Sequence, residues 1–113
     1  MCDAHRDQTW KDLHRDYVLV CTHGWEVEIR DGQTVTLGRS ATESAFAGRL
    51  AEFRFVSGRH ASLTSREGRL LIRDHDSRNG TRIRDRRVEP ETDHILVPGD
   101  RVTLGGQVVL YVR

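Results

Sequence analysis

The chain has 113 residues and a formal net charge of +1, with 36% hydrophobic and 31% charged residues. This length predicts a single domain with a hydrophobic core of its own. No apolar run approaches the roughly 20 residues of a membrane-spanning helix, and the near-neutral total argues against a nucleic-acid-binding domain, which is usually strongly basic.

The N-terminal residues and the cysteines indicate a cytoplasmic protein. Residues 1–7 are polar and include acidic side chains, unlike a signal or transit peptide. The two cysteines, Cys2 and Cys21, do not make a disulfide framework, and reduced thiols fit a cytosolic address.

The basic residues are biased in type and uneven in position. Seventeen of the eighteen are Arg, a bias that a GC-rich genome also produces. Arg is the side chain whose planar fork matches a phosphate. Five of them gather within ten residues, opposed only by Asp85: Arg78, Arg82, Arg84, Arg86 and Arg87. Such a run suits an acidic or phosphorylated ligand, although most charge runs are simply solvated.

Residues 1–16 form a polar N-terminal extension with a loosely helical scatter of apolar residues. We expect a short helix or a partly frayed segment there. From Tyr17 the period changes to two, and in residues 25–30 apolar and charged side chains alternate, which predicts a half-buried strand. Asp31-Gly32 then predicts a hairpin turn, and the alternation resumes at Val35 and Leu37.

Short strand-like runs continue to the end of the chain. They cover residues 53–56, 61–64, 69–73, 81–84, 87–89, 95–97, 102–104 and 108–112, with turn residues such as Glu67-Gly68 and Gly105-Gly106 between them. This succession of short strands, without an amphipathic helix, predicts an all-β sandwich over residues 17–113. One long irregular connection runs from Ser40 to Glu52, a length typical of a functional or mobile loop.

Three polar clusters lie where predicted strands begin or end. They are Gly38-Arg39-Ser40, Ser57-Gly58-Arg59-His60 and Asp76-Ser77-Arg78-Asn79-Gly80-Thr81. Together they offer guanidinium, hydroxyl and amide donors but no paired catalytic carboxylates. This set suits the binding of an anion and suits bond-breaking poorly.

These clusters resemble the pattern of the forkhead-associated (FHA) domain family. The family has Gly-Arg at a strand end, then Ser-x-x-His, then Ser/Thr-x-Asn-Gly before a strand, and a late Gly-Asp turn. The chain has Gly38-Arg39, Ser57-Gly58-Arg59-His60, Ser77-Arg78-Asn79-Gly80 and Pro98-Gly99-Asp100 in that order. The resemblance runs from about Tyr17 to Arg113 and implies an FHA-like sandwich of about eleven short, mostly antiparallel strands in two sheets.

The resemblance also implies roles for individual residues. Arg39 and Ser57 would bind the phosphate of a phosphothreonine peptide, and Asn79 would hold the peptide main chain. Three other residues would shape the binding loops: Gly38, His60 and Gly80. The implied protein is a signalling adaptor downstream of Ser/Thr kinases. It would have phosphothreonine proteins as partners, neither nucleic acid nor membrane, and no catalytic activity, cofactor or metal.

Two positions depart from the family pattern. The residue after the Ser is often Arg, Asn or Lys in the family and is Gly58 here, which offers only backbone. The residue before the Asn is often Thr and is Arg78 here. We expect Arg78 to supply a second cation that compensates for Gly58, so both belong to the predicted phosphopeptide-binding set.

Three alternatives accompany this prediction. A degenerate phosphate pocket would leave a phosphate-independent interaction or dimerisation module. Ser57 and His60 suggest a hydrolase, but no orienting acid stands at a defined spacing and no nucleophile elbow is present. A zinc site would use Cys-x-x-His and Cys-x-His pairs, of which the second has an unusual spacing. Its ligands would be Cys2, His5, Cys21 and His23.

Overall fold

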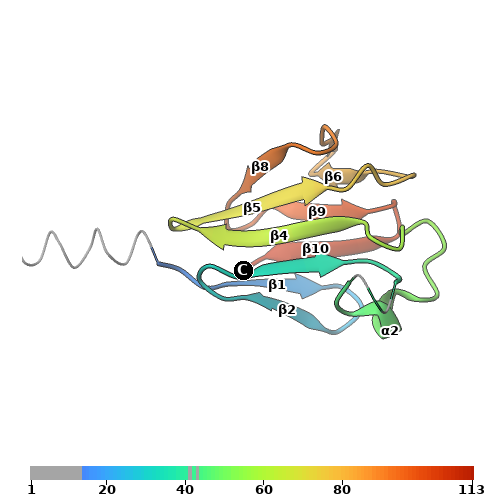
Figure 1. The fold of residues 1–113 in the computed structure, drawn as a ribbon, viewed down its shortest axis with the longest axis horizontal. Coiled ribbons are helices and arrows are strands. Elements are labelled where there is room, and N and C mark those ends of the chain that lie inside the picture. The colour runs from blue at the N-terminus through green and yellow to red at the C-terminus, as the bar shows by residue number, and fades with distance from the viewer. Residues whose placement is uncertain (1–13, 41, 43) are drawn as a thin grey trace, which may run out of the picture.

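The computed structural model describes residues 14–40, 42 and 44–113. Its ten strands are β1 (Tyr17–Cys21), β2 (Glu26–Ile29), β3 (Thr34–Leu37), β4 (Ala61–Arg66), β5 (Arg69–Asp74), β6 (Thr81–Ile83), β7 (Arg86–Arg87), β8 (Asp93–Leu96), β9 (Arg101–Leu104) and β10 (Val108–Val112). They form a six-stranded sheet in the order β2-β1-β10-β9-β6-β7 and a four-stranded sheet in the order β3-β4-β5-β8. All pairs are antiparallel, and the two sheets face one another (Figure 1). The predicted all-β sandwich is confirmed.

Alternation of side chains along the strands decides which face of each sheet is buried. Along β2, exposed and buried residues alternate, and Val27 and Ile29 face the core. Leu19 of β1 pairs with Val27 on one side and with Val112 of β10 on the other, and all three side chains are buried. A slip of one residue would turn these side chains to solvent, so the core fixes the register.

The connection from β3 to β4 differs from its prediction. It contains one short helix, α2 (Ala47–Leu50), whose Leu50 is fully buried. The strand predicted for residues 53–56 is absent, because these residues form turns closed by the Val56 N–H to Phe53 carbonyl bond. Val56 is buried while Phe55 is 53% exposed, so this apolar run anchors a loop instead of pairing in a sheet.

The start of β1 and the C-terminus lie toward one end of the sandwich, and the connections from β3 to β4 and from β5 to β6 lie at the other (Figure 1). The Arg113 N–H donates to the Val18 carbonyl, which ties the C-terminus to the start of β1. Residues 1–13 of the expected N-terminal extension lie outside the described residues. In the part of the chain that is described, no helix has the length and apolar character needed to cross a membrane.

Candidate functional site

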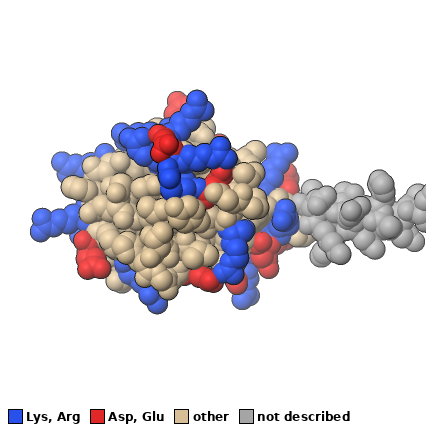
Figure 2. All heavy atoms as spheres, turned by 180° about the vertical axis from the view of Figure 1, so that it is seen from behind, with Lys and Arg blue, Asp and Glu red and all other residues tan. Residues whose placement is uncertain are grey.

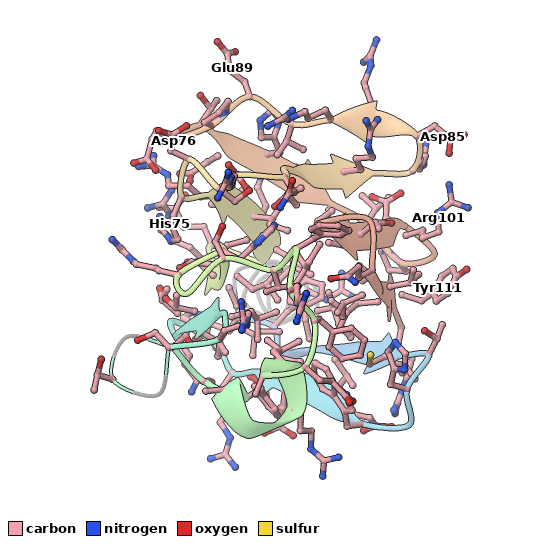
Figure 3. The ribbon with its side chains drawn as sticks, turned by 90° about the vertical axis from the view of Figure 1, so that its right-hand side faces the viewer. His75, Asp76, Asp85, Glu89, Arg101 and Tyr111 are labelled. Carbon is pink, nitrogen blue, oxygen red and sulfur yellow. The ribbon has the colours of Figure 1, made fainter. Side chains whose placement is uncertain are left out.

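Three loops at one end of the sandwich carry the predicted site residues. They are residues 38–40 after β3, residues 55–60 before β4, and residues 75–80 between β5 and β6. Figure 3 looks on to this end, with His75 and Asp76 marking the connection from β5 to β6. Segments distant in sequence therefore meet here because the sheet order brings β3, β4 and β5 side by side.

Gly38 brings the end of β3 against the segment before β4. A Cβ atom at Gly38 would lie 2.0 Å from the Gly58 carbonyl oxygen and 2.9 Å from the Ser57 carbonyl oxygen. This approach lets the Arg39 N–H donate to the Ser57 carbonyl at 3.1 Å and the Ser40 N–H to the Gly58 carbonyl at 3.0 Å. Because only glycine fits, the backbone of Arg39 is fixed relative to Ser57.

His60 is fully buried and joins two of the loops. Its Nδ1 accepts the Ser57 N–H at 2.9 Å, so its ring proton is on Nε2, which donates to the Gly80 carbonyl at 2.9 Å. Burial lowers the pKa of the His60 imidazole and so favours the neutral form that this bonding needs. Both ring nitrogens of His60 are occupied, so His60 is not placed to take a proton from the Ser57 hydroxyl.

A buried carboxylate, Asp74, holds the connection from β5 to β6. It accepts the Ser77 N–H at 3.0 Å, the Ser77 hydroxyl at 2.5 Å and the Thr81 hydroxyl at 2.7 Å. Burial raises the pKa of Asp74, but the hydrogen bonds from Ser77 and Thr81 outweigh it, so the pKa is below its ordinary value. Gly80, with φ of 83°, adopts the left-handed backbone that ends this loop.

Ser57 and Asn79 lie on adjoining loops. The Ser57 Oγ accepts the backbone N–H of Arg78 at 3.1 Å and donates to none of the described residues, so its proton is available to a ligand. The Asn79 side chain is exposed, and its Nδ2 donates to the Phe55 carbonyl at 3.1 Å. Its amide oxygen and second amide hydrogen bond to none of the described residues and suit a peptide backbone.

The Arg39 side chain is exposed, and its Nε donates to the Ala51 carbonyl at 3.2 Å. Among residues 14–40, 42 and 44–113, no acidic side chain pairs with this guanidinium, and its two terminal amino groups make no hydrogen bond. A guanidinium held at Nε with its outer edge open can bind two phosphate oxygens at once.

Gly58, Arg59 and Arg78 are exposed at the same end. A Cβ atom at Gly58 would meet only Ser40, at 3.4 Å from its Cβ, so a side chain would fit there. The bond from the Arg78 N–H to the Ser57 hydroxyl places Arg78 beside that group. The structure thus brings together all five residues predicted to bind a phosphopeptide: Arg39, Ser57, Gly58, Arg78 and Asn79.

Three residues that build this end were not identified from the sequence: Asp74, Phe55 and Gln107. The Phe55 N–H donates to the Gln107 Oε1 at 2.8 Å, across 52 positions in the chain, and no local signal predicts that contact. Asp74 followed by Ser77 is a different case. Asp side chains often accept a hydrogen bond from a backbone N–H a few residues later and so mark turns, so the bond from the Ser77 N–H to Asp74 could have been predicted.

The zinc alternative has two of its four ligands, Cys21 and His23, in the described part of the chain. Cys2 and His5 lie outside the described residues. Elsewhere, in the described ranges, no group of three or more His, Cys, Asp and Glu side chains is placed to hold a metal ion. Cys21 is a buried free cysteine, and burial raises the pKa of its thiol, which disfavours the thiolate that binds metals.

A model of the FHA domain family matches residues 35–105 of this chain. A search of curated proteins found no significant match. Among solved structures, one from a study of phosphothreonine-dependent FHA domain interactions is 27% identical, with 88% of this chain and 96% of that chain covered and a TM-score of 0.72. An FHA domain of a hypothetical protein of Arabidopsis thaliana is 25% identical, with coverages of 89% and 86% and a TM-score of 0.77.

A third structure is similar in fold. It is the N-terminal FHA domain of Rad53p from S. cerevisiae, solved in complex with a phosphothreonine peptide. It is 22% identical to this chain, with 87% of this chain and 92% of that chain covered and a TM-score of 0.69.

Proposed function

Because the chain belongs to the FHA domain family, we propose that it is a phosphothreonine-dependent peptide-binding module. The observation that carries the proposal is the meeting of Arg39, Ser57 and Asn79 on adjoining loops, each with donors that no described residue occupies. The similarity to a domain studied for phosphothreonine-dependent interactions supports it.

In this proposal the phosphate lies between Arg39 and Ser57. A phosphate near neutral pH carries almost two negative charges and three strong acceptor oxygens. The Arg39 guanidinium offers two parallel N–H donors, and the Ser57 hydroxyl offers a third donor. Arg78, next to Ser57, supplies a second cation, and Asn79 binds the main chain of the peptide. Phosphorylation would therefore switch binding on.

Gly38, His60 and Gly80 keep these donors in place without touching the ligand. Gly38 permits the backbone contact to the segment before β4, and His60 spans from Ser57 to Gly80. The partners would be proteins modified by Ser/Thr kinases, which makes the domain a non-catalytic signalling adaptor.

Gly58 favours a second candidate function. A family position that often carries a cationic or amide side chain offers only backbone here, although a side chain would fit. A weakened phosphate pocket would leave a phosphate-independent interaction module. The two functions differ in whether the phosphate on the ligand is needed.

A binding assay with fluorescein-labelled peptides separates them. An oriented library of phosphothreonine peptides would be compared with its unphosphorylated and phosphoserine counterparts. The proposal expects binding of the phosphothreonine peptides only. Arg39→Ala removes charge-assisted hydrogen bonds worth about 1.5–3 kcal/mol, so affinity should fall about 10- to 100-fold.

The matched control is Arg69→Ala, which removes an exposed Arg at the opposite end of the sandwich. It should leave affinity unchanged. Arg78→Ala should weaken binding and reduce its dependence on salt concentration, because one cation fewer faces the phosphate. Equal affinity for phosphorylated and unphosphorylated peptides would reject the phosphothreonine proposal and favour the second candidate.

A further inference from the structure

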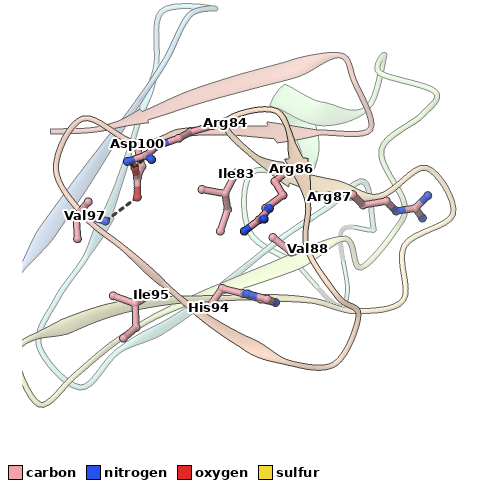
Figure 4. Close-up of a pocket in the computed structure, with 9 residues that line it drawn as sticks. All are labelled: Ile83, Arg84, Arg86, Arg87, Val88, His94, Ile95, Val97 and Asp100. Atoms are coloured by element: carbon pink, nitrogen blue, oxygen red, sulfur yellow. Dashed lines mark hydrogen bonds and ion pairs between the residues drawn. The ribbon is translucent and has the colours of Figure 1, made fainter.

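A groove runs along the open edge of the sandwich, between β6–β7 of one sheet and β8 of the other (Figure 4). We call it the edge groove, and its volume is about 600 Å³. It is lined by Ile83, Arg84, Arg86, Arg87, Val88, His94, Ile95, Val97 and Asp100. None of these residues belongs to the proposed phosphopeptide site.

The floor and one rim of the edge groove are apolar. Ile83 is half-buried and Val88 is only 6% exposed, so both form the floor. Ile95 and Val97 are 55% and 47% exposed, and they are two of the four large hydrophobic side chains that stand out among the described residues. Exposed apolar side chains beside an open groove indicate a binding surface, which an aliphatic side chain of a partner would cover.

The other rim carries unpaired positive charge. Arg84 pairs with Asp100 at 2.8 Å, so the acid in the groove is already neutralised. Arg86 and Arg87 are exposed, and within the described residues neither makes an ion pair. The Arg86 side chain points into the space between the strands, whereas the Arg87 side chain points away from it and lies against Gly80 (Figure 4).

The surface around the edge groove is also rich in basic side chains. Basic side chains gather at the top of the molecule, where β6 and β8 lie in Figure 1 (Figure 2). The exposed carboxylate of Asp85 is held by Arg101 at 2.7 Å.

The backbone at this edge is also available. Among the described residues, β7 is the last strand of its sheet with β6 as its one neighbour, and β8 is the last strand of the other sheet and pairs only with β5. An edge strand directs alternate N–H and C=O groups away from its neighbour, where an extended chain can pair with them.

We infer that the edge groove binds an extended acidic segment of a partner protein, independently of phosphorylation. In an extended chain, alternate side chains face opposite ways. Aspartate or glutamate side chains would lie against Arg86, with Arg87 adding positive charge beside the groove, while aliphatic side chains between them cover Ile83 and Val88. Charge complementarity selects this partner, because an unpaired cationic rim beside an apolar floor matches an acidic chain with aliphatic anchors.

Arginines on a sheet edge also protect against aggregation by repelling other edges. That role alone predicts no preference among anions. Binding of an acidic peptide with aliphatic anchors, in preference to a polyanion without them, therefore separates a binding groove from a merely protective edge.

The probe is a fluorescein-labelled, unphosphorylated peptide in which Asp and Glu alternate with Ile and Val, without Ser, Thr or Tyr. Its counterpart replaces the acids with Asn and Gln. Binding to the full chain is followed by fluorescence anisotropy at several salt concentrations. We expect the acidic peptide alone to bind, with affinity falling as salt rises.

Arg86→Glu together with Arg87→Glu should weaken binding at least about tenfold, because attraction becomes repulsion. The matched control, Arg49→Glu with Arg69→Glu, makes the same change of net charge away from the groove and should have little effect. Ile95→Ser with Val97→Ser keeps the charge and should weaken binding roughly fivefold. Thermal unfolding checks that each variant folds. If the pair of substitutions at Arg86 and Arg87 unfolds the domain, Arg86→Glu alone replaces it.

Three results would overturn the inference: no binding of the acidic peptide, equal losses in the groove and control variants, or equal binding of a single-stranded oligothymidine. The last would mean a general polyanion or nucleic-acid surface. Arg39→Ala should leave this binding unchanged while it weakens binding of phosphothreonine peptides about 10- to 100-fold, so failure of either proposal is visible separately.

Discussion

Replacing Gly38 by alanine should destabilise the domain and disturb its binding end together. The added methyl group would lie 2.0 Å from the Gly58 carbonyl oxygen and 2.6 Å from the Gly58 carbonyl carbon. Both are backbone atoms, so no side chain can rotate away, and the segment before β4 must move. That movement stretches the two bonds by which Arg39 and Ser40 hold this segment.

The cost can be worked from these contacts. Forcing a methyl group into a packed position typically costs about 1–3 kcal/mol. Weakening two backbone hydrogen bonds adds about 0.5–1.5 kcal/mol each. The free energy of unfolding of Gly38→Ala should therefore fall by about 2–6 kcal/mol, against a total of about 5–15 kcal/mol for a domain of ordinary stability.

Urea unfolding followed by tryptophan fluorescence measures this loss. The matched control is Gly48→Ala in α2, where a Cβ atom meets nothing within 4 Å. Alanine is the better helix former, so the control should be neutral or more stable by up to about 1 kcal/mol. If Gly38→Ala unfolded at the same urea concentration as Gly48→Ala, the close approach would not constrain the loops and the reasoning would fail.

Other consequences concern the buried polar groups. Burial lowers the pKa of His60 in the folded state, so the unfolded chain binds the proton more readily. The contribution of neutral His60 to the free energy of unfolding should therefore be fully present above about pH 6.5 and should decline below that pH. Urea unfolding should show a shallower decline for His60→Gln, and an unchanged slope would contradict this. For Asp74, whose folded pKa is lowered, the stabilisation is present above its unfolded pKa and is lost as pH falls through the folded value. Asp74→Asn should lower the free energy of unfolding by about 1–3 kcal/mol at pH 7, and a neutral result would refute a stabilising carboxylate. Asn79→Ala should cost at most about 1.5 kcal/mol of stability yet abolish detectable phosphothreonine-peptide binding, and intact affinity would remove Asn79 from the site.

The sequence was most informative where local chemistry repeats. Alternation in residues 25–30 predicted β2, and the clusters at Arg39, Ser57 and Asn79 predicted three polar loops. Their meeting at one end could be expected because, in antiparallel strands joined in succession, every second loop lies at the same end of the sheet. The strand predicted at residues 53–56 was wrong because apolar content alone does not separate a buried anchor from a paired strand.

Contacts between distant segments could not be predicted. The hydrogen bond from the Phe55 N–H to Gln107 depends on how the two sheets are stacked, and the donation of the Gly105 N–H to the Gly80 carbonyl at 2.9 Å depends on the pairing of β6 with β9. The edge groove likewise exists only because β7 and β8 end their respective sheets. The run of arginines in the sequence does not predict that apolar side chains form the floor of a groove beside it.

The start of β1 and Arg113 are joined by a hydrogen bond, toward the end of the sandwich opposite the connections from β3 to β4 and from β5 to β6 (Figure 1). A tether appended to Arg113 therefore leads away from the loops that we propose to bind the peptide. Protein immobilised through that residue would present its recognition loops outward, and a fused reporter there would not obstruct an incoming peptide.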